Sequence, residues 1–216
     1  MNNILGVIIS FVYIGALMVA SKYFEKFDKE ASRKFIHILL GNWWLIAMAF
    51  FDNIVAALIP PIAFVIINYI SYKGNVIKVM ERDEENKDGL GTVYFALSLV
   101  VLVILSYGVK NNPLVGLVGF FIMTYGDGFA AIGGKAIESK KYTVLGSTKS
   151  LAGSLIMFVI SLVVTLSVFA YSDVSLFALK AIVISIIATI LEAISAKGTD
   201  NITVPVISSL LTMVVL

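Results

Sequence analysis

The sequence has no cysteine and only one histidine, His37, among its 216 residues. The chain therefore cannot form a disulfide, a thiolate zinc site or a cysteine nucleophile, and it cannot bind a metal through several histidines. Charged residues are also scarce, at 14% of the chain, while hydrophobic residues reach 59% and the mean hydropathy is +0.98. A water-soluble domain of this size would need far more polar surface. The composition predicts an integral membrane protein.

Long apolar runs indicate how the chain crosses the membrane. A transmembrane helix needs about 20 apolar residues, and the runs are continuous rather than alternating, which favours helices over a β-barrel. We therefore predict an all-α fold, a polytopic helical bundle in a single domain over residues 1–216. The expected spans are 4–20, 35–51, 54–72, 93–109, 113–134, 151–171, 176–194 and 202–216.

Basic residues gather on one side of these eight spans. The connections after spans one, three, five and seven carry Lys22, Lys26, Lys29, Arg33, Lys34, Lys73, Lys78, Arg82, Lys87, Lys135, Lys140, Lys141, Lys149 and Lys197. The other side has only Lys110, with Lys180 early in span seven. The positive-inside rule then places these connections in the cytoplasm and both termini outside the cell membrane.

Two of the cytoplasmic connections have the pattern of short interfacial helices. Phe24, Phe27, Ala31 and Phe35 recur every three to four residues, with lysines and glutamates between them. Apolar residues of the segment 76–80 precede a charge run at 81–85. Both patterns are typical of amphipathic helices that lie on a membrane. A solvated linker fits the second segment equally well.

One acidic residue, Asp127, lies inside the fifth span, directly after the almost wholly apolar residues 114–125. An ionised aspartate at such depth costs roughly 2.5–3.5 kcal/mol even on the lenient insertion scale. It therefore needs compensation from Mg²⁺, a lysine, a polar cavity or a substrate, and we nominate it as a catalytic residue. Gly126, Ala130 and Gly134 recur around it every four residues, which indicates a smooth stripe for close helix packing.

The segment Gly146-Ser147-Thr148-Lys149-Ser150 leads directly into the sixth span. Hydroxyl groups, a cation and the free N–H groups of a helix N-terminus suit a phosphate. The order of residues is not that of a Walker A loop. An ordinary helix cap by Ser150, together with a lysine of the positive-inside pattern, explains the segment equally well.

Further polar residues are predicted on the same side of the membrane. Glu192 lies near the cytoplasmic end of span seven, and Asp200 and Asn201 follow it. Their oxygen atoms are hard ligands that suit Mg²⁺, although Asp200 is equally typical of a solvated loop. Arg33 and His37 begin the second span, where they either bind an anionic group or are structural. This convergence on a lipid-facing bundle suggests phosphoryl or nucleotidyl transfer to a lipid.

Several short motifs, in matching order, resemble the CTP-dependent lipid kinases, the family of dolichol kinase, phytol kinase and yeast-type diacylglycerol kinase. They are Asp127-x-x-Ala130-x-x-x-Gly134-Lys135, Lys149-Ser150-Leu151-x-Gly153-Ser154, and Glu192 followed by Asp200-Asn201-x-Thr203-x-Pro205. Arg33-Lys34-x-x-His37 and Gly91-Thr92-x-Tyr94 are similar to earlier blocks of the family. Ala152 is a departure, because many family members carry an acidic residue there.

The resemblance implies that the chain transfers the γ-phosphate of CTP to a lipid alcohol such as a polyprenol, dolichol or phytol, with Mg²⁺ as cofactor. It implies catalytic roles for Asp127, Glu192 and His37, and metal binding by Asp127 and Asp200. Nucleotide-binding residues would be Arg33, Lys135, Ser147, Thr148, Lys149, Ser150 and Asn201. We expect membrane lipids but no nucleic acid as partners, and the sequence leaves a homodimer open.

Two other functions remain open at this point. CDP-diglyceride synthases have a similar aspartate-containing block and a similar lysine-rich loop, but this chain lacks their His-Gly-Gly…Asp-Arg signature. A lipid or ion transporter without enzymatic activity would instead use Asp127 and Glu192 as coupling carboxylates. Binding of a nucleotide in the presence of Mg²⁺ separates the enzymes from the transporter.

Overall fold

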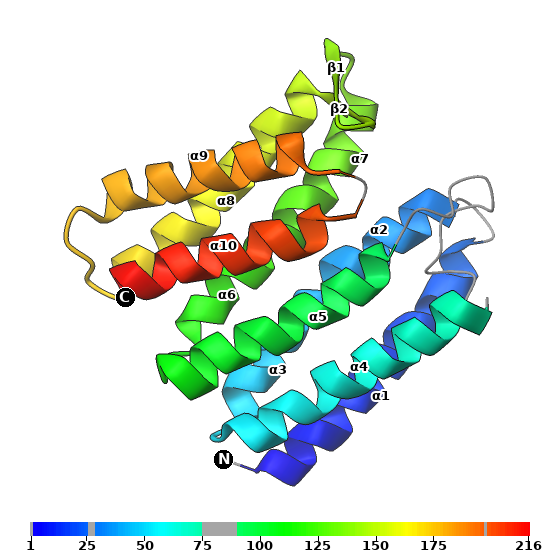
Figure 1. The fold of residues 1–216 in the computed structure, drawn as a ribbon, viewed down its shortest axis with the longest axis vertical. Coiled ribbons are helices and arrows are strands. Elements are labelled where there is room, and N and C mark those ends of the chain that lie inside the picture. Colours follow the sequence, from blue (N-terminus) through cyan, green and yellow to red (C-terminus); the bar gives the residue numbers. More distant parts are fainter. Residues whose placement is uncertain (1, 26–28, 75–89, 197) are drawn as a thin grey trace.

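The computed structural model describes residues 2–25, 29–74, 90–196 and 198–216, and helices make up most of this part (Figure 1). The helices are α1 (Asn3–Glu25), α2 (Lys29–Leu40), α3 (Trp43–Phe50), α4 (Ile54–Gly74), α5 (Gly91–Val103), α6 (Leu114–Phe121), α7 (Gly128–Ala136), α8 (Leu151–Tyr171), α9 (Phe177–Ile194) and α10 (Asp200–Val215). Two π-helical segments, η3 (Ile104–Val109) and η4 (Ile122–Asp127), continue α5 and α6, and two strands, β1 (Lys141–Val144) and β2 (Ser147–Ser150), precede α8. The predicted all-α fold class is confirmed.

Six helical segments in the described part are long and apolar enough to cross a membrane. They are Asn3–Ser21, Ile54–Gly74, Gly91–Val109, Leu114–Ala136, Leu151–Tyr171 and Phe177–Ile194, and each matches one predicted span. The shorter helix α10 corresponds to the last predicted span. The total of eight crossings stays a prediction.

The predicted span 35–51 is not one continuous helix, because the chain turns between α2 and α3. A side chain at Gly41 would lie 2.5 Å from Thr124 Oγ1, so only glycine allows this close approach to η4. Asn42 accepts a hydrogen bond of 2.6 Å from the hydroxyl of Tyr125, which also belongs to η4. Packing against η4 therefore ends α2, and the hydrophobicity of the span does not reveal this contact.

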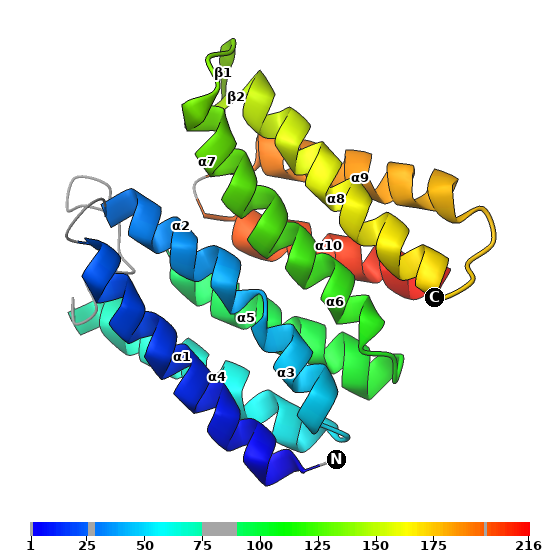
Figure 2. The same cartoon turned by 180° about the vertical axis from the view of Figure 1, so that it is seen from behind.

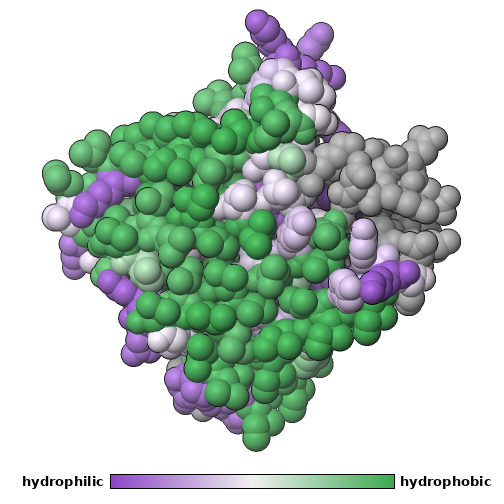
Figure 3. Space-filling model, viewed as in Figure 1, coloured by the Kyte–Doolittle hydropathy of each residue, from purple (hydrophilic) through white to green (hydrophobic). Residues whose placement is uncertain are grey.

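The surface of the bundle is hydrophobic between two hydrophilic ends. In Figure 3 apolar residues cover most of the visible face, and hydrophilic residues gather at its edges and at the hairpin. Large side chains that face outward along the long helices are apolar, as at Ile66, Val159 and Ile186. This distribution suits a helical bundle in a membrane.

The two ends of the bundle carry different elements. Figures 1 and 2 place the hairpin of β1 and β2 at one extremity and the N-terminus at the opposite one. Which end faces the cytoplasm stays a prediction. The side chains of the first proposed interfacial helix at Phe24, Phe27 and Ala31 lie outside the described residues. So do the whole second segment, 76–85, and Lys197.

The hairpin was not predicted from the sequence. Strands β1 and β2 are antiparallel, with Lys141 opposite Ser150 and Val144 opposite Ser147. The two residues of the turn, Leu145 and Gly146, have φ angles of 47° and 77°. Two-residue hairpin turns with positive φ at both positions match the twist of the strands. The turn reverses the chain, so that β2 returns toward the bundle and leads into α8.

The predicted stripe of small residues packs against α8. A side chain at Gly126 would lie 2.7 Å from Met157 Sδ, and one at Gly134 would lie 2.6 Å from Ser150 Oγ. Gly153 of α8 also has a close neighbour, since a side chain there would lie 3.0 Å from the carbonyl oxygen of Ala130. The three glycines let η4 and α7 approach α8 and its N-terminus closely, as expected for small residues in membrane helices.

Candidate active site

A cavity of about 830 Å³ opens among the hairpin, α2, α5, α7, the end of α9 and the start of α10. Its volume lies in the usual range for small-molecule sites, about 300–1,000 Å³. Every residue nominated from the sequence lines it: Arg33, His37, Asp127, Lys135, Ser147, Thr148, Lys149, Ser150, Glu192, Asp200 and Asn201. The structure thus brings together five segments that are far apart along the chain.

The first charge centre consists of Lys34, His37 and Asp127. Lys34 Nζ lies 2.8 Å from Asp127 Oδ2, and His37 Nε2 lies 3.4 Å from the same oxygen. His37 Nε2 also lies 3.2 Å from the carbonyl oxygen of Met123. Both neighbours of Nε2 are acceptors, so this nitrogen carries the proton in the neutral ring. Asp127 therefore has the compensating cation that its depth requires.

Lys34 was not nominated from the sequence, although it is the direct partner of Asp127. It is 8% exposed, as is Asp127. A weak signal was available, because Lys34 and His37 are three residues apart and residues at this spacing lie on one face of a helix. The sequence did not reveal that this face meets η4, since 93 residues separate the two partners.

A π-helical segment carries Asp127 into the cavity. Segment η4 ends at Asp127, and α7 begins at Gly128 without a break in the helix. The wider π turn changes the direction in which the side chains around it project, and such segments occur frequently at functional sites. A side chain at Gly128 would lie 2.4 Å from Ile38 Cγ1. Glycine next to Asp127 thus allows α2 to lie close enough for the ion pair.

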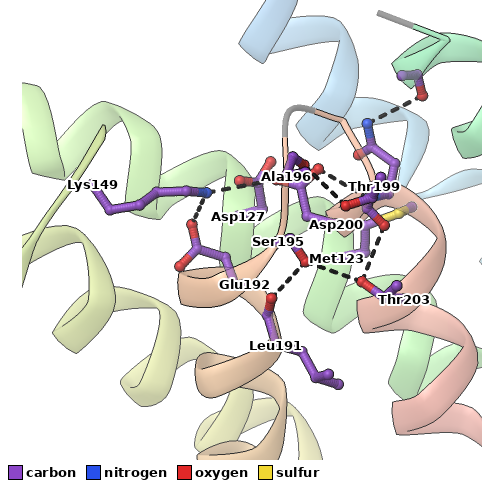
Figure 4. A network of polar contacts seen from close by, with 12 residues as sticks. Met123, Asp127, Lys149, Leu191, Glu192, Ser195, Ala196, Thr199, Asp200 and Thr203 are labelled. Carbon is purple, nitrogen blue, oxygen red and sulfur yellow. Dashed lines mark hydrogen bonds and ion pairs between the residues drawn. The ribbon is translucent and has the colours of Figure 1, made fainter. Parts of the chain in front are cut away.

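The second charge centre consists of Lys149, Glu192 and Asp200 (Figure 4). The amine of Lys149 hydrogen-bonds to the carboxylate of Glu192, and Lys149 Nζ lies 3.6 Å from Asp200 Oδ2. Burial alone lowers the pKa of Lys149, but the carboxylates of Glu192, Asp200 and Asp127 outweigh it and raise this pKa above its ordinary value. The amine is therefore protonated at physiological pH.

Two nominated residues have structural contacts. Ser150 caps α8, because its hydroxyl accepts a hydrogen bond of 3.1 Å from the backbone N–H of Gly153. This contact is the ordinary cap that the sequence allowed. The side-chain amide of Asn201 donates a hydrogen bond of 3.1 Å to the carbonyl oxygen of Gly91, which joins the starts of α10 and α5.

Three further nominated residues line the cavity around the hairpin, while Arg33 lines it from α2. Ser147 and Thr148 lie on β2, and Lys135 lies in the last turn of α7. The hydroxyls of Tyr142 and Ser154 form a hydrogen bond that ties the hairpin to α8. This side of the cavity therefore presents hydroxyls and amines, the groups that bind phosphate oxygens.

The opposite side of the cavity is apolar. Ile36 and Leu40 of α2, Phe64 of α4 and Phe95 of α5 line it. The ring of Phe95 meets the ring of His37 edge-on, with a centroid distance of 5.2 Å. The first charge centre thus lies at the border between the polar and the apolar side.

The residues around the cavity suit a metal that arrives with a phosphate. In the described part of the chain, no group of three or more histidine, aspartate or glutamate side chains is arranged to hold a metal by itself. Mg²⁺ commonly uses one or two carboxylates and completes its shell with substrate phosphates and water. Asp127 and Asp200, in one cavity, fit that mode, and their assignment as ligands stays a prediction.

The chain is similar to proteins named phytol kinase. It is 29% identical to the phytol kinase of Synechocystis sp., over 92% of this chain and 86% of the relative. It is 27% identical to phytol kinase 1, chloroplastic, of Arabidopsis thaliana, over 82% of this chain and 64% of the relative. The probable phytol kinase 1, chloroplastic, of Oryza sativa is also 27% identical, over 85% and 63%.

The similarity does not include the full length of every relative. The chain spans slightly less than two thirds of the length of the two plant relatives. No protein-family profile matches the chain, and no solved structure matches it. The match to the bacterial relative nonetheless includes most of both chains, and its name agrees with the resemblance that the motifs carry. The chain is similar to the phytol kinases over most of its length, and its resemblance to the lipid kinase family is confirmed.

Proposed function

We propose that this protein phosphorylates an isoprenoid alcohol, such as phytol, a polyprenol or dolichol, at the cytoplasmic face of a membrane. The donor in this proposal is a nucleoside triphosphate, CTP, together with Mg²⁺. The supporting observation is a single cavity in which two lysine–carboxylate centres lie beside an apolar wall. The similarity to phytol kinases supports the same reaction.

The nucleotide phosphates would lie near the second charge centre and the hairpin. Lys149, Lys135 and the hydroxyls of Ser147 and Thr148 line this side of the cavity. A protonated lysine and hydroxyl donors bind phosphate oxygens through charge-assisted hydrogen bonds. The lipid alcohol would occupy the apolar side, with its hydroxyl at the first charge centre.

The reaction is a direct transfer between the two sides. The alcohol oxygen forms a bond to the γ-phosphorus while the bond from that phosphorus to the bridging oxygen breaks, and the nucleoside diphosphate leaves with the bridging oxygen. The hydroxyl proton passes to Asp127. The transition state of such transfers is loose, so we expect the proton to leave late and a carboxylate of low basicity to suffice.

Substrate binding would exchange the partners of the two lysines. In the structure Lys34 pairs with Asp127 and Lys149 pairs with Glu192. Phosphate oxygens would take over the lysines, while Asp127 and Asp200 would hold Mg²⁺, which neutralises charge on the phosphates. Because Mg²⁺ would replace the lysines beside Asp127 and Asp200, nucleotide and Mg²⁺ should bind together more tightly than either alone.

A label-transfer assay tests the proposal. The purified protein is incubated with Mg²⁺, a panel of lipid alcohols, and CTP or ATP labelled at the γ- or the α-phosphate. We expect an isoprenyl monophosphate that carries the γ-label and forms fastest with CTP. Appearance of the α-label in the lipid would support a CDP-lipid synthase instead. Absence of nucleotide binding with Mg²⁺ would favour the transporter.

The predicted cytoplasmic face can be tested because the native chain has no cysteine. Lys140 precedes the hairpin, and Lys110 lies in the connection between η3 and α6. We expect an impermeant thiol reagent to label a Lys110→Cys variant in intact cells, and a Lys140→Cys variant only after the membrane is opened. The reverse pattern would place the cavity on the outer face.

A further inference from the structure

A second, much smaller cavity of about 10 Å³ lies behind the apolar side of the main cavity. Its lining comes from α1, α2, α3, α4 and α5, and it includes Ile14, Trp43, Pro60 and Leu99. Two residues, Leu40 and Phe64, line both cavities. These two side chains therefore separate the main cavity from the interior of the N-terminal helices.

The separation is closed in the structure. A volume of about 10–15 Å³ holds about one water molecule, so the small cavity has no room for a hydrocarbon chain. Leu40 and Phe64 are each 4% exposed, and Trp43 is 2% exposed. The described residues that line the small cavity are apolar and offer no partner for water.

Helix α2 carries both Leu40 and two residues of the first charge centre, Lys34 and His37. Lys34 and His37 lie on the cavity at the polar end of α2, and Leu40 is its last residue. Residues three apart along a helix lie on one face. The cavity face of α2 therefore changes from charged to apolar within two turns, as a site for an alcohol with a hydrocarbon chain requires.

We infer that Leu40 and Phe64 form the end wall of the site for the lipid chain, and that they set the length of isoprenoid alcohol that the protein accepts. This inference rests on the proposed function, since it assigns the apolar side of the cavity to the chain of the alcohol. Removing either side chain would join the main cavity to the space in front of Trp43 and Leu99, and a larger residue at position 40 would shorten the site.

The length preference is measured as the ratio of kcat/KM for geranylgeraniol to that for farnesol. A difference of one methylene in an apolar pocket typically changes kcat/KM by about 10–200-fold. We expect Phe64→Ala and Leu40→Ala to raise the ratio by roughly tenfold or more, by the same reasoning, and Leu40→Phe to lower it.

Phe64→Leu serves as a milder variant in case Phe64→Ala does not fold. Phe169→Ala, at a fully buried site on α8 that lines neither cavity, is the matched control. An unchanged ratio in the wall variants would overturn the inference.

A binding measurement tests the wall without any turnover. A Leu99→Cys variant places a single thiol behind the wall, in a space that is too small for a thiol reagent while Phe64 is intact. We expect a small membrane-permeant thiol reagent to label this cysteine readily only when Phe64→Ala is also present, and geranylgeraniol to slow that labelling. Equal labelling with and without Phe64→Ala, or labelling of the double variant that geranylgeraniol does not slow, would contradict the wall. Selective protection without any phosphorylated lipid would uphold the wall and refute the proposed kinase reaction.

Discussion

The two charge centres have the same chemistry but are built differently. In the first, Lys34 of α2 and Asp127 of η4 meet between helices inside the bundle, beside an apolar wall. In the second, Lys149 of β2 meets Glu192 and Asp200, which lie at the end of α9 and the start of α10. The first centre depends on helix packing, whereas the second depends on a hairpin and on helix ends.

This difference suggests a division of work between the centres. The side chains of Lys34 and Asp127 are 10% and 12% exposed, whereas in the second centre Lys149 is 18% exposed and Glu192 is 4% exposed. The two centres therefore differ in the exposure of the lysine rather than of every carboxylate. A buried pair between packed helices, beside apolar residues, suits the reacting hydroxyl of a lipid. A lysine on a hairpin suits a polyphosphate that enters and leaves in each cycle.

Asp127→Asn should lower kcat by about 10²–10⁴-fold, the usual effect of removing a general base. The KM for the nucleotide should change less than kcat, because Asp200 and Lys149 of the second centre would still hold Mg²⁺ and the phosphates after Asp127 has lost its charge. Steady-state rates with γ-labelled nucleotide measure both quantities. Asp173→Asn, at an exposed position outside the cavity, is the control. Near-native activity of Asp127→Asn would show that the carboxylate of Asp127 is structural rather than catalytic.

Stability must be separated from activity in this variant. Asp127→Asn leaves a buried lysine without its carboxylate, and breaking a buried pair on one side costs about 3–5 kcal/mol. The double variant Lys34→Met and Asp127→Asn removes the unpaired charge. We expect it to regain much of the lost thermal stability in detergent, while turnover stays low.

Lys149→Ala should raise the KM for the nucleotide by roughly 10–150-fold, since a hydrogen bond to a charged group contributes about 1.5–3 kcal/mol. The KM for the lipid alcohol should change little. Because the carboxylates raise the pKa of Lys149, the nucleotide KM should also stay independent of this group's titration at neutral pH. Lys110→Ala, at an exposed lysine outside the cavity, is the control. A loss confined to kcat would assign Lys149 to the reacting centre instead.

A pair of double-mutant cycles compares the two centres directly. For Lys34 with Asp127 we expect a coupling free energy of about 1–3 kcal/mol, within the range for contacting residues. For Lys149 with Glu192 we expect a smaller value, because Lys149 retains Asp200 when Glu192 is changed to Gln. Thermal unfolding of the single and double variants in one detergent measures both. A larger coupling at the hairpin would reverse the proposed ranking.

Gly146→Ala should have the smallest effect. Gly146 has a φ of +77°, and a left-handed conformation costs a non-glycine residue about 1–2 kcal/mol. Among the described residues, no atom lies close enough to meet the added methyl group, and the same holds for Gly15 within α1. Gly15→Ala is therefore a control with ordinary helical geometry. We expect a severalfold higher nucleotide KM for Gly146→Ala alone, and an unchanged response to the lipid alcohol.

Much of the fold was predictable because hydrophobicity reports it directly. The span 151–171 coincides with α8, and Ser150 caps this helix as the sequence allowed. The break after Leu40 was not predictable, because Gly41 and Asn42 end α2 through contacts with η4, more than 80 residues away. The hairpin was missed for a different reason: its strands are four residues long and its turn, Leu145-Gly146, is not a strong turn signal.

The sequence predicted which residues belong to the candidate site, but not which of them form ion pairs. Asp127 and Glu192 could be nominated because the charge of an acidic residue near the membrane needs a compensating partner. The sequence did not indicate which lysine compensates which carboxylate, since the pairs join segments 93 and 43 residues apart. Nothing in the sequence distinguished Leu40 and Phe64 from other apolar residues, because apolar residues in a membrane span are usually in contact with lipid or with other helices.

The 93 residues between Lys34 and Asp127 also have a consequence for biosynthesis. Chains are made from the N-terminus onward, so α2 leaves the ribosome well before η4. Until η4 arrives, the amine of Lys34 has no Asp127 to neutralise it, and a lysine near a helix end can reach the headgroup region through its long stem. We therefore expect α2 to remain at the membrane surface in a nascent chain that ends before residue 114, and to take its final depth only after the fifth hydrophobic segment is inserted.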